Sequence, residues 1–257
     1  MKNDLKILST KTLRALNCTL YVGGDFINNG SFDAGSGIVI FNGTGNQEIK
    51  GNAITFNKLI VDKTGGVLYA KTSITVTDFK LRQGEFNPGN FTHYVKGNWD
   101  DAGGVFTPDS GMIVICGTGK QQIKQGTGNN FYKLKIALQN AQDTVEFVSS
   151  IDVNSEFIMQ NGVIIPGAYT HYICGNWDDA LCTFKPSQGE IVLDDADTIY
   201  IKQGANNNFA NLTINTGSVV NLETNIKVNN FTLQSGYLKD AVACTLWVDG
   251  DWVEVGG

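Results

Sequence analysis

The sequence predicts an all-β fold, a parallel β-helix (β-solenoid) built from about three repeats of ~75 residues. The first observation is a nine-residue segment that occurs four times, at residues 18–26, 91–99, 169–177 and 244–252. Its shared glycine falls at Gly24, Gly97, Gly175 and Gly250, so the copies are 73, 78 and 75 residues apart. The second observation is that the segments between copies alternate apolar and polar residues, as strands buried on one face do. The third is that no window of about eleven or more residues carries the apolar spacing of a helix.

Each repeat continues with the same elements in the same order. A first apolar element lies at residues 37–43, 111–117 and 189–195, and a second at residues 47–51, 121–125 and 199–203. A third lies at residues 56–61, 131–136 and 209–214, and the last at residues 78–84, 156–162 and 230–236. Glycine and asparagine between these elements supply the turns.

The length of the repeat selects among all-β architectures. It exceeds the roughly 40–45 residues of a propeller blade, and no spacer of the kind that separates sandwich domains occurs. We therefore expect one continuous solenoid over residues 1–257, with about three coils of three short strands in each repeat. The repeats are placed at roughly 24–96, 97–174 and 175–249, with partial repeats at both ends.

The alternation assigns side chains to faces within residues 91–99. The predicted inward set is Phe91, His93, Val95, Gly97 and Trp99, and the predicted outward set is Thr92, Tyr94, Lys96 and Asn98. The glycine leaves room at a corner, and the aromatic residue that follows it is expected to fill the bend. That aromatic is Phe26, Trp99, Trp177 or Trp252 in the four copies.

The composition of the chain limits the classes of partner that it can bind. The net charge is −6 without a basic stripe, which argues against nucleic acid. No apolar run approaches the roughly 20 residues of a membrane span, so we expect no membrane insertion. The first residues lack the apolar core of a signal peptide, so an export signal would lie outside this sequence. Because the chain begins and ends inside a repeat, we expect flanking repeats of a longer chain or end-to-end stacking of copies.

Three motifs together resemble the repeats of large bacterial surface proteins. They are Phe131-Tyr-Lys-Leu-Lys-Ile136, Val95-Lys-Gly-Asn-Trp99 and Gln121-Gln-Ile123, with their counterparts in the other repeats. The resemblance covers essentially the whole chain and is to Bacteroidetes-style adhesins with a pectin-lyase-like right-handed parallel β-helix. It implies extracellular or cell-surface display, and a role in adhesion or scaffolding.

The two histidines, His93 and His171, occupy equivalent positions in their repeats. Leucine fills that position in the outer copies, at Leu20 and Leu246. A residue that leucine replaces is expected to be a core residue rather than a base or a metal ligand. We find no arrangement of nucleophile and base, and we predict no catalytic residue.

Acidic residues recur after the bend aromatic at Asp100, Asp101, Asp178 and Asp179. A denser group, Asp194, Asp195 and Asp197, occurs in one repeat only. Oxygen-rich turns of this kind bind calcium, so this group is the one candidate metal site. A solvated turn is the competing interpretation and the one we favour, and no other cofactor is expected.

The five cysteines give an odd count. Cys18 and Cys244 fall at inward positions and are expected to be small core residues. Cys116 and Cys174 fall at outward positions, and Cys182 lies in the next loop after Cys174. The sequence leaves a bridge between Cys174 and Cys182 open for an exported protein.

The candidate binding surface is an outward aromatic column of Tyr21, Tyr94, Tyr172 and Trp247. Such rings stack on sugars or meet a neighbouring rod, and ordinary cross-strand packing is the equal alternative. We therefore expect a non-enzymatic extracellular structural or adhesive module, part of a longer rod or filament, with surface glycans as partners. The alternative is a carbohydrate-binding or carbohydrate-active β-helix, similar to a polysaccharide lyase, with an acidic groove.

Overall fold

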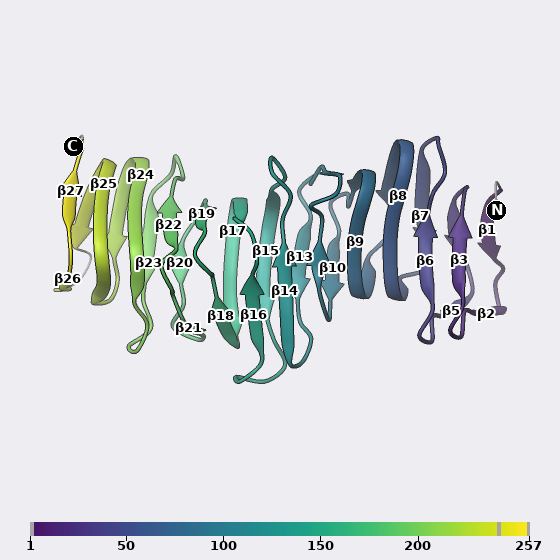
Figure 1. The fold of residues 1–257 in the computed structure, drawn as a ribbon, viewed down its shortest axis with the longest axis horizontal. Coiled ribbons are helices and arrows are strands. Elements are labelled where there is room, and N and C mark those ends of the chain that lie inside the picture. Colours follow the sequence, from purple (N-terminus) through teal and green to yellow (C-terminus); the bar gives the residue numbers. More distant parts are fainter. Residues whose placement is uncertain (1–2, 241–242, 256–257) are drawn as a thin grey trace. The chain divides into compact units, whose positions relative to one another are not determined.

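The computed structural model describes residues 3–240 and 243–255, and it confirms the all-β prediction. No helix occurs among the described residues, and parallel strands stack coil on coil in a β-solenoid of about 12 turns. The chain forms two compact units, Met1–Gly117 with Lys124–Tyr132, and Thr118–Ile123 with Lys133–Gly257. In each unit the strands of successive coils lie side by side (Figure 1).

Thirteen strands lie wholly in the first unit. They are β1 (Leu5–Ile7), β2 (Thr12–Arg14), β3 (Thr19–Val22), β4 (Phe26–Asn28), β5 (Ser31–Asp33), β6 (Ile38–Phe41), β7 (Gln47–Gly51), β8 (Ile54–Ala70), β9 (Ile74–Asn87), β10 (Thr92–Val95), β11 (Trp99–Asp100), β12 (Val105–Phe106) and β13 (Met112–Ile115). The strands β14 (Lys120–Lys124) and β15 (Phe131–Ala137) contain residues of both units.

Twelve strands lie in the second unit. They are β16 (Thr144–Phe147), β17 (Asp152–Asn161), β18 (Val163–Ile165), β19 (Thr170–Ile173), β20 (Trp177–Asp178), β21 (Thr183–Phe184), β22 (Glu190–Leu193), β23 (Ile199–Lys202), β24 (Phe209–Leu222), β25 (Ile226–Asp240), β26 (Leu246–Val248) and β27 (Trp252–Glu254). The longest of them, β24 and β25, run without a break around corners of the coil, with register shifts where they turn.

A coil has three sides, as the pairing of β3, β4 and β5 shows. In the next coil, β6 pairs in parallel with β3 and β7 pairs in parallel with β4. The third strand, β5, pairs in parallel with β2 of the preceding coil. Because three different columns of strands each pair in parallel, each unit has three flat faces. Apolar side chains on alternate positions point between these faces and make the core.

The predicted inward and outward sets are confirmed for most of residues 91–99, while Phe91, Thr92 and Gly97 are of intermediate burial. His93, Val95 and Trp99 are buried, whereas Tyr94 and Lys96 are exposed. Aromatic rings fill the interior of the first unit, where Trp99 stacks on the ring of the preceding coil. Trp177 is fully buried in the second unit. The counterpart in the last copy differs, since Trp252 is half-exposed.

The repeat does not contain a whole number of coils. In the first unit, four successive pairings stack Leu20, Val39, Leu59, Phe79 and Trp99 in one column. Trp99 is not the counterpart of Leu20, however. It is the counterpart of Phe26, one side further along the coil.

The second unit repeats this arrangement with His171, Ile191, Leu212, Phe231 and Trp252 in one column. One repeat therefore occupies four coils less one side, rather than the three coils expected. Equivalent residues of successive repeats lie on different faces as a consequence.

The shared glycine is required by a contact with the coil below. At Gly97 an added Cβ would lie 2.7 Å from Oδ1 of Asp78, and this oxygen accepts the N–H of Asn98 at 2.9 Å. In the second unit, Asn230 caps the residue after Gly250 in the same way. A side chain at the glycine would displace the capping oxygen, so the residue has a packing role in joining coils.

Candidate functional site

His93 on β10 is buried and joins three segments of the first unit. The N–H of Ile74 donates to its Nδ1 at 3.2 Å, and its Nε2 lies 2.8 Å from the carbonyl oxygen of Pro88. A ring nitrogen that accepts an N–H carries no proton, so the proton of this imidazole is on Nε2 and is donated to the carbonyl. The side chain is a neutral bridge between two backbone groups.

His171 on β19 repeats this bridge within the second unit. It accepts the N–H of Ile151 at 3.1 Å and donates to the carbonyl of Pro166 at 2.8 Å. Burial lowers the pKa of His171 to about 4 and lowers the pKa of His93, although the contact with the proline carbonyl acts in the opposite direction. The prediction that both histidines are core residues is confirmed.

Asp101 closes a coil-to-coil clamp in the first unit. Its carboxylate accepts the N–H of Gly126 at 2.5 Å and the indole N–H of Trp99 at 3.1 Å. Its backbone carbonyl accepts from the amide of Asn129, whose Oδ1 in turn accepts the N–H of Phe106 at 3.0 Å. Both Asp101 and Asn129 are buried.

Asp179 and Asn207 form the same clamp in the second unit. Asp179 accepts the N–H of Gly204 at 2.5 Å, and Asn207 donates to the Asp179 carbonyl and accepts the N–H of Phe184 at 3.0 Å. The indole nitrogen of Trp177 and Oδ2 of Asp179 are buried without completing the hydrogen bond seen in the first copy. Asp101 and Asp179 hold loops together and are buried, whereas the recurring acid Asp178 lines a separate hollow of the second unit.

Burial governs the charge of both clamp acids. It raises the pKa of Asp101 to about 6 and raises the pKa of Asp179, while the hydrogen bonds from the glycine N–H groups act in the opposite direction. A carboxyl group whose pKa is raised by burial can act as a proton donor in catalysis. Neither side chain reaches solvent, so we assign both a structural role.

The structure arranges the candidate calcium residues as a turn. Oδ1 of Asp195 accepts the N–H of Asp197 at 3.1 Å, and Oδ1 of Asp194 lies 3.6 Å from the thiol of Cys174. Burial raises the pKa of Asp194. Within the described residues, no group of three acidic, histidine or cysteine side chains has a metal-binding arrangement.

None of the five cysteines, all within the described residues, forms a disulfide, and this includes Cys174 and Cys182, between which the sequence leaves a bridge open. Burial raises the pKa of each of these two to about 12, and neighbouring carboxylates add to the effect. Both therefore stay protonated at neutral pH and are poor nucleophiles. Cys18 is exposed, contrary to the expectation of a small core residue.

The outward aromatic residues do not form one column. In the first unit, Tyr21 pairs with Ile40 on the β3–β6 face, whereas Tyr94 pairs with Val114 on the β10–β13 face. Each ring thus lies beside an aliphatic side chain of the next coil. Both tyrosines are close to half-exposed, at 53% and 41%.

The second unit separates its pair in the same way. Tyr172 pairs with Val192 on the β19–β22 face, and Trp247 pairs with Lys227 on the β25–β26 face. The four residues were predicted as one column because they are equivalent in sequence. The rotation of the repeat places them on different faces within each unit, so each ring can act only as a separate contact.

Lys63 on β8 is a buried lysine that sequence reasoning missed. Its ammonium donates to the carbonyl oxygens of Gly43 and Gly45, each at 2.8 Å, and to Oε1 of Gln47 at 2.7 Å. Burial lowers its pKa to about 8. The sequence does contain an indication of this, because the equivalent positions in the other repeats hold Leu138 and Thr216 and a lysine occurs only at Lys63.

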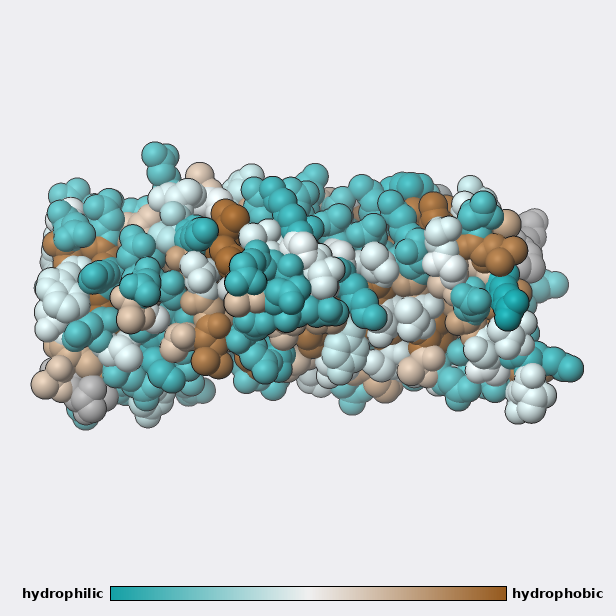
Figure 2. All heavy atoms as spheres, turned by 90° about the horizontal axis from the view of Figure 1, so that it is seen from below, coloured by the Kyte–Doolittle hydropathy of each residue, from teal (hydrophilic) through white to brown (hydrophobic). Residues whose placement is uncertain are grey.

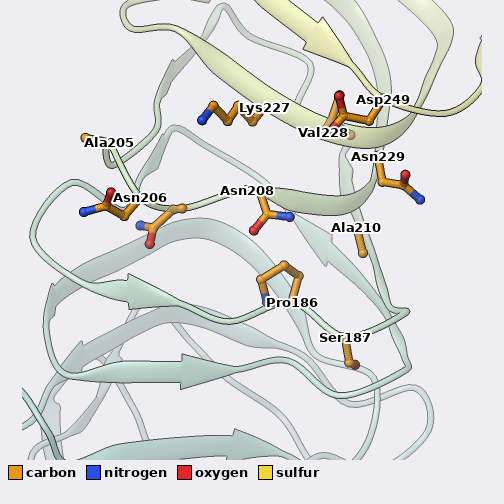
Figure 3. Close-up of a pocket in the computed structure, with 11 residues that line it drawn as sticks. Pro186, Ser187, Ala205, Asn206, Asn208, Ala210, Lys227, Val228, Asn229 and Asp249 are labelled. Atoms are coloured by element: carbon orange, nitrogen blue, oxygen red, sulfur yellow. The ribbon is translucent and has the colours of Figure 1, made fainter.

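A polar hollow of about 560 Å³ opens on the second unit. It is lined by side chains and backbone of Pro186, Ser187, Ala205, Asn206, Asn207, Asn208, Ala210, Lys227, Val228, Asn229 and Asp249. Figure 3 shows Asn208 in the middle of this space, with Lys227 on one side and Asn229 and Asp249 on another. We call this hollow the asparagine groove.

A second hollow of about 270 Å³ adjoins the asparagine groove. Its lining continues the first one at consecutive residues, with Gln188 after Ser187 and Asn211 after Ala210. Tyr169, 41% exposed, lines the far part of this second hollow. The two together make one polar groove that turns a corner of the coil.

The asparagine run was not among the residues that sequence reasoning singled out. The segment 204–209 reads Gly-Ala-Asn-Asn-Asn-Phe, where the preceding repeat has Gly-Thr-Gly-Asn-Asn-Phe at 126–131. Asn207 keeps the structural position of Asn129, and Asn206 replaces a glycine. Comparing the two loops position by position would have shown the additional amide.

On the face seen in Figure 2, hydrophilic residues predominate and apolar ones are scattered. In the described part of the chain, no helix has the length and apolar character needed to cross a membrane. Comparisons of the chain with models of protein families, with curated proteins and with solved structures found no match.

Proposed function

We propose that this chain is a non-enzymatic structural module, displayed outside the cell, which serves as part of a longer adhesive rod or filament. The observation that carries the proposal is what the repeats preserve. The histidine bridge and the aspartate–asparagine clamp occur once in each unit with the same partners. Both join one coil to the next. Selection for a stiff stack of coils would preserve these groups.

The carbohydrate-active alternative needs an exposed group of acidic residues. Asp101 and Asp179 are buried, and Asp195 is occupied in a local turn. None of these carboxylates lines the polar groove of the second unit, where Asp249 is the single acidic side chain of the larger hollow. A separate hollow of about 630 Å³ has Glu156 and Asp178 in its lining, and these pair with Lys133 at 3.0 Å and Lys202 at 3.3 Å. A pair of carboxylates on either side of a glycosidic bond is the usual requirement for glycoside hydrolysis.

Two measurements on the purified chain test this proposal. Incubation with pectin, alginate and xylan should release neither new reducing ends nor unsaturated products. Pulling single molecules from their two ends should give high unfolding forces, because the strands on all three sides of a coil must separate from the next coil together. Cleavage of any of these polysaccharides would establish the enzymatic alternative, and unfolding at low force would contradict a load-bearing role.

Display and self-association are tested separately. When the chain is displayed on a carrier bacterium, cells should be retained on glycan-coated surfaces more than cells that carry the empty display anchor. Sedimentation at increasing protein concentration should show growth of end-to-end assemblies. Equal retention of both cell types would contradict adhesion, and a monomer at every concentration would leave continuation into flanking repeats as the route to a rod.

A further inference from the structure

We propose that the asparagine groove of the second unit binds carbohydrate. The first argument is that its polar side chains are not used by the fold. Among the described residues, no side-chain hydrogen bond or ion pair engages Asn208, Asn229 or Asp249. The side chain of Asn206 likewise makes no hydrogen bond to another described residue. The ammonium of Lys227 lies 5.8 Å from the centre of the Trp247 ring. These groups are exposed around one hollow.

The mixture of groups selects the chemical class of the ligand. Carboxamides both donate and accept hydrogen bonds, as the hydroxyl groups of a sugar do. One ammonium and one carboxylate, Lys227 and Asp249, leave the groove without net charge. A phosphate would call for several cations, a metal ion for several oxygen anions, and an apolar ligand for an apolar lining. A neutral polyhydroxy ligand satisfies the groups that are present.

The shape of the groove fits a short oligosaccharide. The larger hollow has a volume of about 560 Å³, within the range of roughly 300–1,000 Å³ typical of small-molecule sites. The adjoining hollow adds about 270 Å³ and brings in the ring of Tyr169 and the carboxylate of Glu190, which already accepts the hydroxyl groups of Thr170 and Thr213. Aromatic rings offer a flat apolar surface to the C–H face of a sugar. Trp247, 44% exposed, lies beside Lys227 but outside the lining of both hollows.

The floor of the groove is held in place before any ligand arrives. Asn207, between Asn206 and Asn208, is buried and donates to the carbonyl oxygens of Asp179 and Cys182 while it accepts the N–H of Phe184. Its two neighbours in sequence are thereby fixed with their side chains outward. A rigid loop reduces the entropy lost on binding, which favours recognition by a few hydrogen bonds.

The test is a titration of the ¹⁵N-labelled full chain with four neutral disaccharides: cellobiose, lactose, maltose and N,N′-diacetylchitobiose. Sodium sulfate and calcium chloride are titrated as anion and cation probes. We expect at least one disaccharide to shift the side-chain amide signals of Asn206, Asn208 and Asn229, with a Kd on the order of 1 mM or below. Neither salt should shift them in a saturable manner.

Variants locate the site. Asn208→Ala and Asp249→Ala should each weaken binding about tenfold or more. Asn130→Ala, at the position equivalent to Asn208 in the preceding repeat, is the matched control and should leave the affinity unchanged. Circular dichroism of each variant verifies the fold.

The inference is overturned if none of the four disaccharides shifts these amides, if Asn208→Ala and Asp249→Ala both bind like the wild type, or if sulfate or calcium saturates the site instead. It does not depend on the structural proposal. Loss of the sugar site would leave the cleavage and pulling results unaffected.

Discussion

Replacing His171 by leucine removes a buried bridge while keeping an apolar side chain that the outer copies of the repeat carry at this position. The substitution leaves the N–H of Ile151 without its acceptor and the carbonyl of Pro166 without its donor. Both residues are buried, so water does not replace either partner. Leu20 and Leu246 at the equivalent positions alone would suggest that leucine is tolerated here, whereas the two hydrogen bonds predict that it is not.

The cost at pH 7.5 follows from the two groups left unpaired. Each buried backbone group that loses its partner costs about 1–3 kcal/mol, and leucine recovers part of this through its apolar contacts. We therefore expect His171→Leu to lower the free energy of unfolding by about 2–4 kcal/mol at this pH. The neighbouring outward variant Tyr172→Leu changes the same strand without breaking a buried hydrogen bond and should cost less than about 1 kcal/mol.

The difference in the free energy of unfolding between the wild type and His171→Leu should become smaller as the pH is lowered. The pKa of His171 is about 4 in the folded protein against an ordinary value of 6.5, so the unfolded chain takes up the proton first. The stability of the wild type consequently falls as the pH drops from 6.5 towards 4, by about 3 kcal/mol for a shift of this size. Leucine has no proton to bind, so this loss is absent in the variant.

Urea unfolding followed by circular dichroism at pH 7.5, 6, 5 and 4 measures this contrast. The two free-energy curves should approach each other on acidification and nearly meet at pH 4. A constant difference across the series would refute the assignment of a neutral buried imidazole. A variant as stable as wild type at pH 7.5 would refute the two hydrogen bonds.

Three further substitutions test other parts of the structure. Because the pKa of Asp101 is about 6 in the folded protein, the folded state keeps this proton to higher pH than the unfolded chain does. The free energy of unfolding of the wild type should therefore lose roughly 3 kcal/mol through this group as the pH rises from 4 to 7, and Asp101→Asn should remove that loss. Parallel pH profiles of the unfolding free energy for both proteins would contradict this. Lys63→Met removes the ammonium that donates to two carbonyl oxygens and to Oε1 of Gln47, which keeps the N–H of Gly43 as a donor, and it should cost about 2–4 kcal/mol in urea unfolding at pH 7; an unchanged midpoint would show that water replaces the ammonium. Trp99→Ala empties a core position that is 2% exposed and should cost about 3–5 kcal/mol; a neutral effect would mean that the ring does not fill the core.

The fold was predictable from the sequence because the alternation of apolar and polar residues indicates strands buried on one face, and the repeat of nearly constant length indicates that these strands stack in coils. His93 and Trp99 were placed inside correctly on this basis. The number of coils in a repeat was not predictable, because the alternation marks strands but does not say which strand of the next coil each one covers. The pairing of Phe79 with Trp99 in the first unit, and of Phe231 with Trp252 in the second, shows that the repeat turns by one side.

The candidate site was less accessible to sequence reasoning. The tyrosines were grouped because equivalent positions were assumed to share a face, an assumption that the rotation of the repeat removes. The asparagine groove combines residues of four successive coils, which contribute Ser187, Asn208, Asn229 and Asp249. Their proximity depends on the register between coils, which no local pattern in the sequence encodes. The buried Lys63 depends in the same way on a loop of the coil below.

The central claim is that the polar residues preserved by the repeat hold coils together and are not available for chemistry. The two histidines test it most directly, because the chain contains no others and their NMR signals are therefore few. A ¹⁵N-edited titration should show both rings as the neutral tautomer protonated on Nε2, with pKa values below the ordinary range and that of His171 near 4. Rings that titrate at or above pH 6.5, or that carry the proton on Nδ1, would contradict the bridges and return both histidines to the list of candidate functional groups.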